Sequence, residues 1–285
     1  MAESWRIILS APGDGSTNMA ADEAILWAVS RGLSAPTLRL YAWDPACLSL
    51  GRAQPASEVD QKRLRALGYG LVRRPSGGRA ILHIDELTYS VCMHKSDPIA
   101  RGGVMPVYRR LSAGLLAGLD ELGLRASSDA IAPCRTAARA VCFEQRSHYE
   151  VTVAERKLMG SAQWRQRGGV LQHGSLPLRG DIGRICDVLA FVSSSQRERA
   201  RGRVRQRAST LTAALGREVE WDHVVGAFLR GFSCALKVQL QRGELSLEEQ
   251  QCAEDLRARK YAQPEWTLGQ HSARPPVRAP MAKTP

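Results

Sequence analysis

The chain has 285 residues, 44% of them apolar and 24% charged, and this composition excludes a disordered chain, a collagen and a coiled coil. Its 40 Lys and Arg residues outnumber 28 Asp and Glu residues, and the net charge of +12 favours nucleic acid, anionic membranes or acidic proteins as partners. No apolar run reaches the about 18 residues of a membrane span, and no signal-peptide core follows Met1, so we expect a soluble, cytoplasmic protein.

The first half of the chain predicts short strands and two helices. A helix capped by Ser16 or Thr17 reaches about Ser30 and ends at Gly32, and a second helix over 57–67 ends at Gly68. The runs that read as strands are 5–10, 37–42, 47–50, 71–73, 79–83 and 87–93.

Helical spacing of apolar residues predicts a further helix over 106–122, whereas residues 149–178 alternate and predict three strands. The last third predicts helices over 208–216, 221–238 and 246–260. We therefore expect an α+β catalytic domain over 1–240 (core about 32–240), a helical C-terminal extension over 241–269 and a disordered tail over 270–285.

The seven cysteines are odd in number and irregularly spaced, and none forms a C-x-x-C pair, which argues against a disulfide framework and a zinc site. Reduced thiols that fill the core are the expectation for most of them. One or two at most should do chemistry; the positions are 47, 92, 134, 142, 186, 234 and 252.

The glycine pair in the motif R-R-P-S-G-G-R-A at 73–80 allows backbone N–H groups to approach a ligand closely. The three arginines suit a phosphate or carboxylate, although a hairpin turn with solvated arginines explains the same letters. The P-loop spacing is absent.

A lysine is unusual in this chain, which has six Lys against 34 Arg, and Lys157 begins the run K-L-M-G-S-A-Q at 157–163. Retaining Lys there hints that a point charge is wanted, although a surface turn is the common explanation. Cys142 lies fifteen residues earlier, and a nearby ammonium would favour its thiolate. A structural role for Cys142 is the alternative.

Two other features are ambiguous by themselves. The motif Q-H-G-S at 172–175 offers His173 as an acid or base, in competition with His148. Arginine occupies every second position from 197 to 207, which predicts either a solvated connection before the next helix or a docking patch for an acidic partner or nucleic acid.

In this order, the motifs resemble the lipoate-protein ligase A and octanoyltransferase superfamily, which has the biotin/lipoate protein ligase fold. The resemblance runs from N-M-A-A-D-E at 18–23 to the K-Y and P-E-W motifs near 260–266, almost the whole chain, and includes L-S-L-G-R-A-Q at 48–54. The fold so implied is a mixed β-sheet flanked by helices.

The sequence departs from the ATP-dependent lipoate ligases at two places. Arg79 replaces their third glycine, and H-I-D-E-L-T-Y-S from His83 replaces H-D-x-G-N. With Cys142 in V-C-F-E, these features are most similar to LipM-type octanoyltransferases. The alternatives, in order, are an ATP-dependent lipoate ligase, an amidotransferase between lipoyl domains, and a non-catalytic module that binds lipoyl domains or nucleic acid.

The resemblance implies an acyltransferase in which Cys142 takes octanoyl from acyl carrier protein, Lys157 stabilises the thiolate, and the acyl group passes to the lipoyl-attachment lysine of the glycine-cleavage H protein or an E2 lipoyl domain. No metal, ATP or redox cofactor, nucleic acid or membrane is expected, and we expect a monomer. Arg73, Arg74 and Arg79 would steer the carrier or its phosphopantetheine phosphate. The implied substrate-binding residues are Arg73, Arg74, Ser76, Gly77, Gly78, Arg79, Ala80, His83, Gly160, Ser161, Ala162, Gln163, His173, Gly174 and Ser175.

Overall fold

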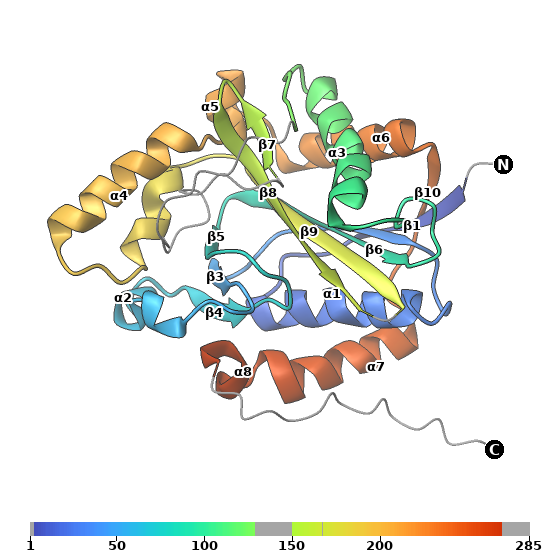
Figure 1. Cartoon of the computed structure of the whole chain (residues 1–285), viewed down its shortest axis with the longest axis horizontal. Helices are drawn as coiled ribbons and strands as arrows, with labels where there is room; N and C mark the ends of the chain where they lie inside the picture. Colours follow the sequence, from blue (N-terminus) through green and yellow to red (C-terminus); the bar gives the residue numbers. More distant parts are fainter. Residues whose placement is uncertain (1–2, 129–149, 167, 270–285) are drawn as a thin grey trace.

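The computed structural model describes residues 3–128, 150–166 and 168–269. Seven strands form one mixed sheet, in which β1 pairs in parallel with two neighbours and the remaining pairs are antiparallel (Figure 1). Their spatial order is β10 (Val238–Arg242), β1 (Glu3–Leu9), β2 (Thr37–Tyr41), β6 (Glu86–His94), β9 (Gly169–Pro177), β8 (Arg156–Arg165) and β7 (Glu150–Val153).

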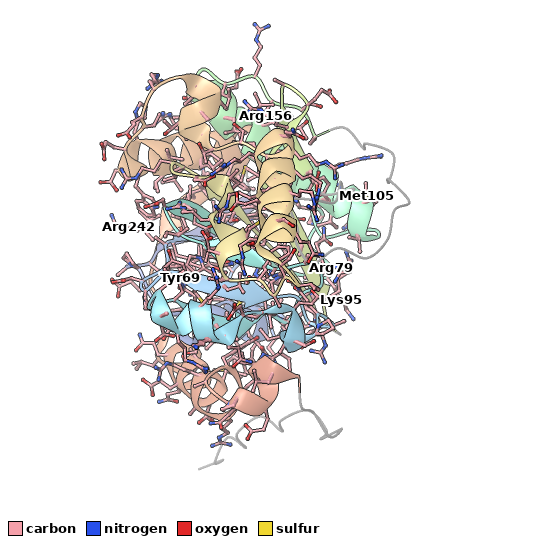
Figure 2. All side chains as sticks on the ribbon, turned by 90° about the vertical axis from the view of Figure 1, so that its left-hand side faces the viewer. Tyr69, Arg79, Lys95, Met105, Arg156 and Arg242 are labelled. Carbon is pink, nitrogen blue, oxygen red and sulfur yellow. The ribbon has the colours of Figure 1, made fainter. Side chains whose placement is uncertain are left out.

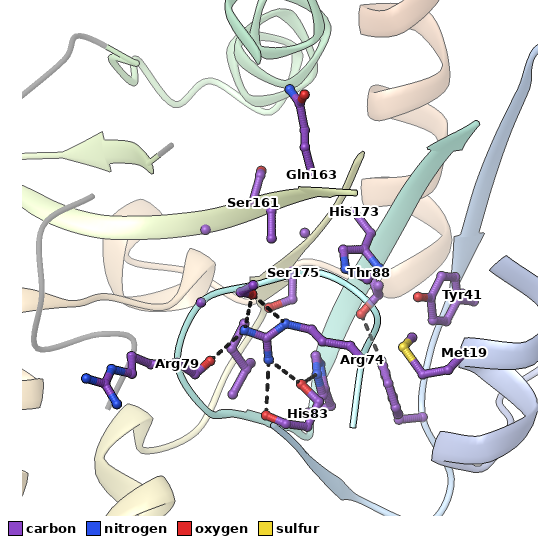
Figure 3. Close-up of a pocket in the computed structure, with 18 of the residues that line it drawn as sticks. Met19, Tyr41, Arg74, Arg79, His83, Thr88, Ser161, Gln163, His173 and Ser175 are labelled. Atoms are coloured by element: carbon purple, nitrogen blue, oxygen red, sulfur yellow. Dashed lines mark hydrogen bonds between the residues drawn. The ribbon is translucent and has the colours of Figure 1, made fainter. Parts of the chain in front are cut away.

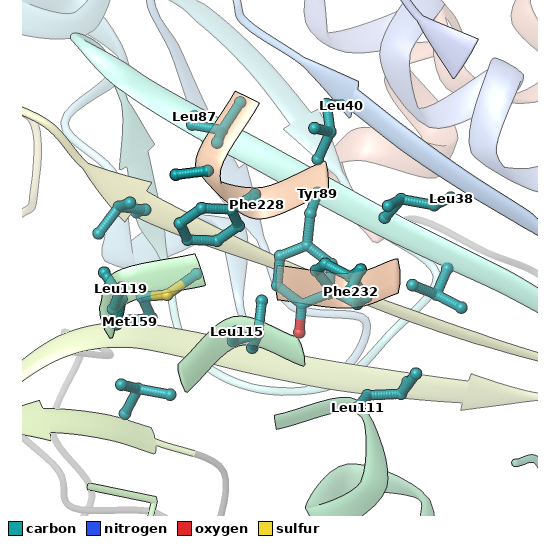
Figure 4. Close-up of a cluster of buried hydrophobic side chains, with 14 of the residues drawn as sticks. Leu38, Leu40, Leu87, Tyr89, Leu111, Leu115, Leu119, Met159, Phe228 and Phe232 are labelled. Carbon is teal, nitrogen blue, oxygen red and sulfur yellow. The ribbon is translucent and has the colours of Figure 1, made fainter. Parts of the chain in front are cut away.

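Helices cover both faces of this sheet (Figure 1). On one face, α3 (Val104–Glu121) packs against α6 (Trp221–Leu236), and Gly118 meets Gly231 so closely that a Cβ on Gly231 would lie 2.3 Å from the Gly118 nitrogen. Figure 4 shows the core between these helices and the sheet, which includes Leu38, Leu40, Leu87, Tyr89, Leu111, Leu115, Leu119, Met159, Phe228 and Phe232.

The opposite face is covered by α1 (Gly15–Val29), and α7 (Leu247–Leu256) lies outside α1. Asp14 caps α1, because its side chain accepts a hydrogen bond from the Thr17 backbone; the predicted cap at Ser16 or Thr17 was therefore a few residues late. After α7 come a π-turn (Arg257–Tyr261) and α8 (Pro264–Leu268).

A second, three-stranded sheet has the order β4 (Gly70–Arg73), β3 (Cys47–Leu50) and β5 (Ile81–His83). It shares a core with the 3₁₀ helix Ile182–Asp187 and with α4 (Ser194–Arg207), whose Ala200 and Val204 are buried at helical spacing. The 57–67 segment is a 3₁₀ turn (Ala56–Glu58) followed by the shorter α2 (Gln61–Ala66).

Helix α4 corrects one prediction, because the segment with arginine at every second position is not a solvated connection. The helical repeat places these arginines in two stripes on roughly opposite sides of α4, one with residues 197, 201 and 205 and the other with residues 199, 203 and 207. Helix α4 lies on the face turned toward the reader in Figure 2. Two of them form ion pairs with the preceding segment, Arg205 with Asp181 at 2.6 Å and Arg201 with Asp187. The described geometry therefore gives no single arginine face.

The other long elements follow the sequence expectations. Strands fall near 5–10, 37–42, 47–50, 71–73, 79–83 and 87–93, three strands lie within 149–178, and α3 and α6 occupy the predicted helices. The predicted 208–216 helix is the short α5 (Leu211–Leu215). The last third is not all helical, since β10 pairs with β1 at the sheet edge. No helix among the described residues is long and apolar enough to cross a membrane.

Candidate functional site

A cavity of about 380 Å³ lies between the large sheet and the loop that joins β4 to β5 (Figure 3). This volume is within the range of small-molecule pockets. Its wall is formed by Met19, Tyr41, Trp43, Ser49, Arg74, Gly77, Gly78, Arg79, Ile81, His83, Thr88, Val104, Lys157, Gly160, Ser161, Ala162, Gln163, His173, Gly174 and Ser175.

A row of residues across five strands forms the floor of the cavity. The strand register places Glu150 opposite Gly160, Gly160 opposite Ser175, Ser175 opposite Thr88, and Thr88 opposite Tyr41. Directly opposed residues of antiparallel strands project to the same face of a sheet. Strands far apart in the chain therefore bring these side chains to one surface.

A β-bulge turns Lys157 toward this row. Val151 pairs with Met159 but Thr152 pairs with Lys157, so β8 has one extra residue at this point. Without the bulge, alternation would place Lys157 on the face of Met159, which packs in the core. With it, the Lys157 side chain lies over Gly160, where a Cβ would be 3.0 Å from Nζ.

The Lys157 ammonium is held in this position by a buried carboxylate. Its Nζ lies 2.9 Å from Oε1 of Glu150, and the two side chains are 4% and 3% exposed. A buried ammonium requires such a partner, because an unpaired charge is very costly to bury. Glu150 was not predicted as a site residue; its place in the alternating strand just before Lys157 was the available signal.

Arg74 shapes the glycine loop over the cavity (Figure 3). It is 4% exposed, and its guanidinium donates to the carbonyl oxygens of Ser49, Gly77 and Arg79 at 2.7–3.2 Å. Gly78 has a φ of +96°, and a Cβ on Gly51 would lie 1.9 Å from the Gly78 oxygen. Glycine is therefore required for this loop to fold against β3.

The structure does not favour the steering role predicted for Arg73 and Arg74, because both guanidinium groups are buried and donate hydrogen bonds to the protein itself. Arg73 donates to the carbonyl oxygens of Gly51, Gln54 and Trp266, and it ties the loop to α8. Arg79 alone of the three lies partly exposed at the cavity wall, with Nη1 3.3 Å from a Glu58 oxygen.

His173 belongs to a buried polar network beneath the cavity. Its Nε2 lies 2.6 Å from Ser76 Oγ, and its Nδ1 lies 3.4 Å from an oxygen of Asp22. Asp22 also accepts hydrogen bonds from Arg39 at 2.8 Å and Tyr41 at 2.9 Å. Burial tends to raise the pKa of Asp22, but the His173 hydrogen bond and the Arg39 charge outweigh it and hold that pKa below its usual value.

His83 is fixed by a second polar chain. Its Nδ1 lies 2.7 Å from Glu86 and its Nε2 lies 2.8 Å from Ser49 Oγ, while its ring stacks on Trp43 with centroids 3.9 Å apart. Ser49 Oγ also accepts a hydrogen bond from Arg74 at 3.0 Å, which holds the hydroxyl beside His83. The His83 ring therefore forms a fixed part of the cavity wall.

The structure brings thirteen of the predicted site residues together around the cavity. They are the predicted catalytic Lys157 and twelve predicted substrate-binding residues: Arg74, Gly77, Gly78, Arg79, His83, Gly160, Ser161, Ala162, Gln163, His173, Gly174 and Ser175. Three other predicted substrate-binding residues, Arg73, Ser76 and Ala80, are buried and do not line the cavity. Cys142 and His148 lie outside the described residues. The described residues contain no group of three His, Cys, Asp or Glu placed to hold a metal ion.

Asp22 and Glu86 were missed as well. Asp22 falls within the motif at 18–23, but its role depends on β2 and β9 meeting α1, which the local sequence does not indicate. Glu86 follows His83 by three residues, and only the turn between β5 and β6 brings its carboxylate to the imidazole.

Comparisons with known proteins agree with this geometry. Residues 14–233 match the family model for the lipoyl protein ligase A/B catalytic domain. Octanoyltransferase LipM of Kyrpidia tusciae is 46% identical, covering 93% of this chain and 98% of that protein. Octanoyltransferase LipM of Symbiobacterium thermophilum is 41% identical, covering 94% and 99%. A solved bipartite lipoate protein ligase of Thermoplasma acidophilum is similar with a TM-score of 0.80 at 26% identity, covering 95% of this chain and 99% of that chain.

Proposed function

Since this chain belongs to the lipoyl protein ligase A/B catalytic domain family, as a LipM-type member, we propose that it transfers an octanoyl group to the lipoyl-attachment lysine of an acceptor protein. Similarity to LipM octanoyltransferases over almost the entire length of both chains carries this conclusion. The cavity agrees with it, since the cavity is large enough for a small ligand and has a buried lysine in its wall.

In the mechanism that we propose, Cys142 attacks the carbonyl carbon of an octanoyl thioester and displaces the donor thiolate. The product is a second thioester, so this half-reaction is nearly isoenergetic. The acceptor amine then attacks the acyl-enzyme, and formation of the amide makes that step downhill. The Lys157 ammonium lies in the cavity wall, where it pairs with Glu150 at 2.9 Å, and an ammonium close to Cys142 would favour the thiolate over the thiol.

The described cysteines support the choice of Cys142 by their positions. None of them lines the cavity. Cys47 and Cys92 are buried, and burial raises the pKa of each thiol, so both remain protonated thiols at neutral pH. Burial also raises the pKa of Cys252, to about 11. The two remaining cysteines, Cys134 and Cys142, lie outside the described residues, and of these the resemblance to LipM-type octanoyltransferases favours Cys142.

We further propose that acyl carrier protein is the donor, that the acceptor is the glycine-cleavage H protein or an E2 lipoyl domain, and that the enzyme is a cytoplasmic monomer. A thioester is already an activated acyl group, so this reaction needs neither ATP nor a metal. Each methylene of the acyl chain that the cavity buries contributes about 0.8 kcal/mol. The depth of the cavity would thus set the preferred chain length.

The experiment that tests this function supplies a lipoyl domain with octanoyl-acyl carrier protein in one reaction and with free octanoate and ATP in another. We expect the acceptor to gain an octanoyl group in the first reaction and none in the second.

The second candidate function is ATP-dependent lipoate ligation, which the similarity to a solved lipoate protein ligase favours. Modification of the acceptor only when ATP and free acid are present would replace the transferase proposal with this one. Both outcomes are read in the same assay, by the mass of the acceptor.

A further inference from the structure

One hydroxyl of the cavity wall has no hydrogen-bond partner among the described residues. Ser175 is 1% exposed, lines the cavity, and its Oγ is unpartnered. The other hydroxyls of the wall are engaged: Ser49 with His83, Thr88 with Glu86, and Ser161 with Tyr89 at 2.6 Å. A buried polar group without a partner destabilises a fold, so its presence at a cavity wall points to a ligand atom that completes it.

Ser175 lies beside the charged part of the site. It is opposite Gly160 in the β8–β9 register, and the Cβ position of Gly160 is 3.0 Å from Lys157 Nζ. Because opposed Cβ atoms of antiparallel strands are about 4.5–5.5 Å apart, the ammonium lies no more than about 8.5 Å from the Ser175 Cβ. The unpartnered hydroxyl and the ammonium therefore border one small region of the cavity.

The position of Ser175 is also fixed before any ligand binds. Strand β9 is paired on both sides, with β6 through Thr88 and with β8 through Gly160. A donor on a rigid central strand needs no rearrangement when charge develops nearby. A water-excluded position increases the strength of such a hydrogen bond.

We propose that the Ser175 hydroxyl donates a hydrogen bond to the carbonyl oxygen of the acyl thioester, which makes Ser175 a catalytic residue; this inference rests on the proposed function. When the acceptor amine attacks the acyl carbon, the C–N bond forms and the carbonyl π electrons move to the oxygen, where Ser175 stabilises the negative charge. Collapse restores the carbonyl and breaks the C–S bond, and the proton lost by nitrogen ends on the departing thiolate. Thioester and amine become amide and thiol, and Ser175 keeps its own proton.

The test is the kinetics of Ser175→Ala and Ser175→Thr in octanoyl transfer from octanoyl-acyl carrier protein to a lipoyl domain. Loss of one oxyanion donor lowers kcat by about 10²–10³-fold. We expect Ser175→Ala to lose at least about 10²-fold in kcat with little change in KM. Ser175→Thr keeps the hydroxyl and should recover at least tenfold of that loss.

Thermal melting separates this role from a structural one. Removal of an unpartnered buried hydroxyl should leave the Tm of Ser175→Ala equal to or above that of the wild type. Ser112→Ala, at a buried serine of α3 outside the cavity wall, is the matched control and should keep full activity.

Two results would count against the proposal in different ways. A wild-type chain that transfers no octanoyl group would overturn the proposed function and this inference with it. A wild-type chain that transfers normally, beside a Ser175→Ala variant with unchanged kcat or with parallel losses of kcat and Tm that Ser175→Thr does not restore, would overturn the role of Ser175 and leave the function standing.

Discussion

Gly160→Ala tests whether the position of the Lys157 ammonium matters for activity. The new Cβ would lie 2.9 Å from Lys157 Cε and 3.0 Å from Nζ, whereas carbon atoms in contact prefer about 3.5–4.0 Å. The end of the side chain must then move by about 0.5–1 Å. Such a displacement would lengthen or misalign the 2.9 Å contact of Nζ with Glu150. A displacement near 1 Å in an active site can cost about 10²-fold in rate.

The stability of this variant should change much less, because the atoms that must move are the far end of a flexible side chain. We expect a cost of about 1–2 kcal/mol, at the lower end for an overpacked site. The assay is octanoyl transfer to a lipoyl domain, with urea denaturation of the same preparation. Gly202→Ala on α4 is the matched control: no atom lies within 4 Å of its Cβ position, so activity should be unchanged and stability slightly higher. Wild-type activity within threefold in Gly160→Ala would refute the reasoning.

Three further predictions follow from the buried charges. Glu150→Gln leaves the Lys157 ammonium without its buried counter-charge and should cost about 3–5 kcal/mol of unfolding free energy in urea, with Glu150→Asp less damaging; an unchanged midpoint would contradict the ion pair. Asp22→Asn should cost about as much at pH 7, because Arg39 loses its carboxylate. Because the pKa of Asp22 is lowered in the folded protein, its carboxylate stabilises the fold above about pH 4, and this contribution is lost as the pH falls further. The difference in unfolding free energy between wild type and Asp22→Asn should therefore be smaller at pH 3 than at pH 7; an equal difference at both pH values would contradict this account. The ammonium of Arg73→Lys cannot donate hydrogen bonds to all of the same carbonyl oxygens, so this variant should lose about 2–3 kcal/mol of unfolding free energy while its activity per folded molecule persists. A large loss of kcat at unchanged stability would instead indicate that Arg73 contacts the substrate.

The regular elements were predictable where one periodicity dominates the local sequence. In α3, Leu111, Leu115 and Leu119 repeat at helical spacing and all three are fully buried. Strand β10 was not predictable in this way, because its residues alternate too weakly to separate them from the preceding helix. Its pairing with β1, more than two hundred residues away, decides its conformation.

The site was predictable as motifs but not as contacts. The direction of the Lys157 side chain depends on a bulge that arises only when β7 pairs with β8. Whether the Ser175 hydroxyl has a hydrogen-bond partner depends on the positions of all the side chains around it in the fold. For Arg73 and Arg74 the motif predicted a contact that the structure does not show. Their charge indicated an anionic ligand, but their N–H groups donate hydrogen bonds to backbone carbonyl oxygens of the protein. A sequence motif gives the residue types at a site, but burial and hydrogen bonding decide which of them meet the substrate.

The most direct test of the central claim is the intact mass of the purified protein after incubation with octanoyl-acyl carrier protein in the absence of ATP. The account predicts one octanoyl adduct that hydroxylamine removes, that Cys142→Ser abolishes, and that persists in Cys234→Ser, which replaces an exposed cysteine of α6. An adduct that survives Cys142→Ser would contradict the assigned nucleophile. No adduct, together with acceptor modification by octanoate and ATP, would contradict the acyl-enzyme mechanism itself.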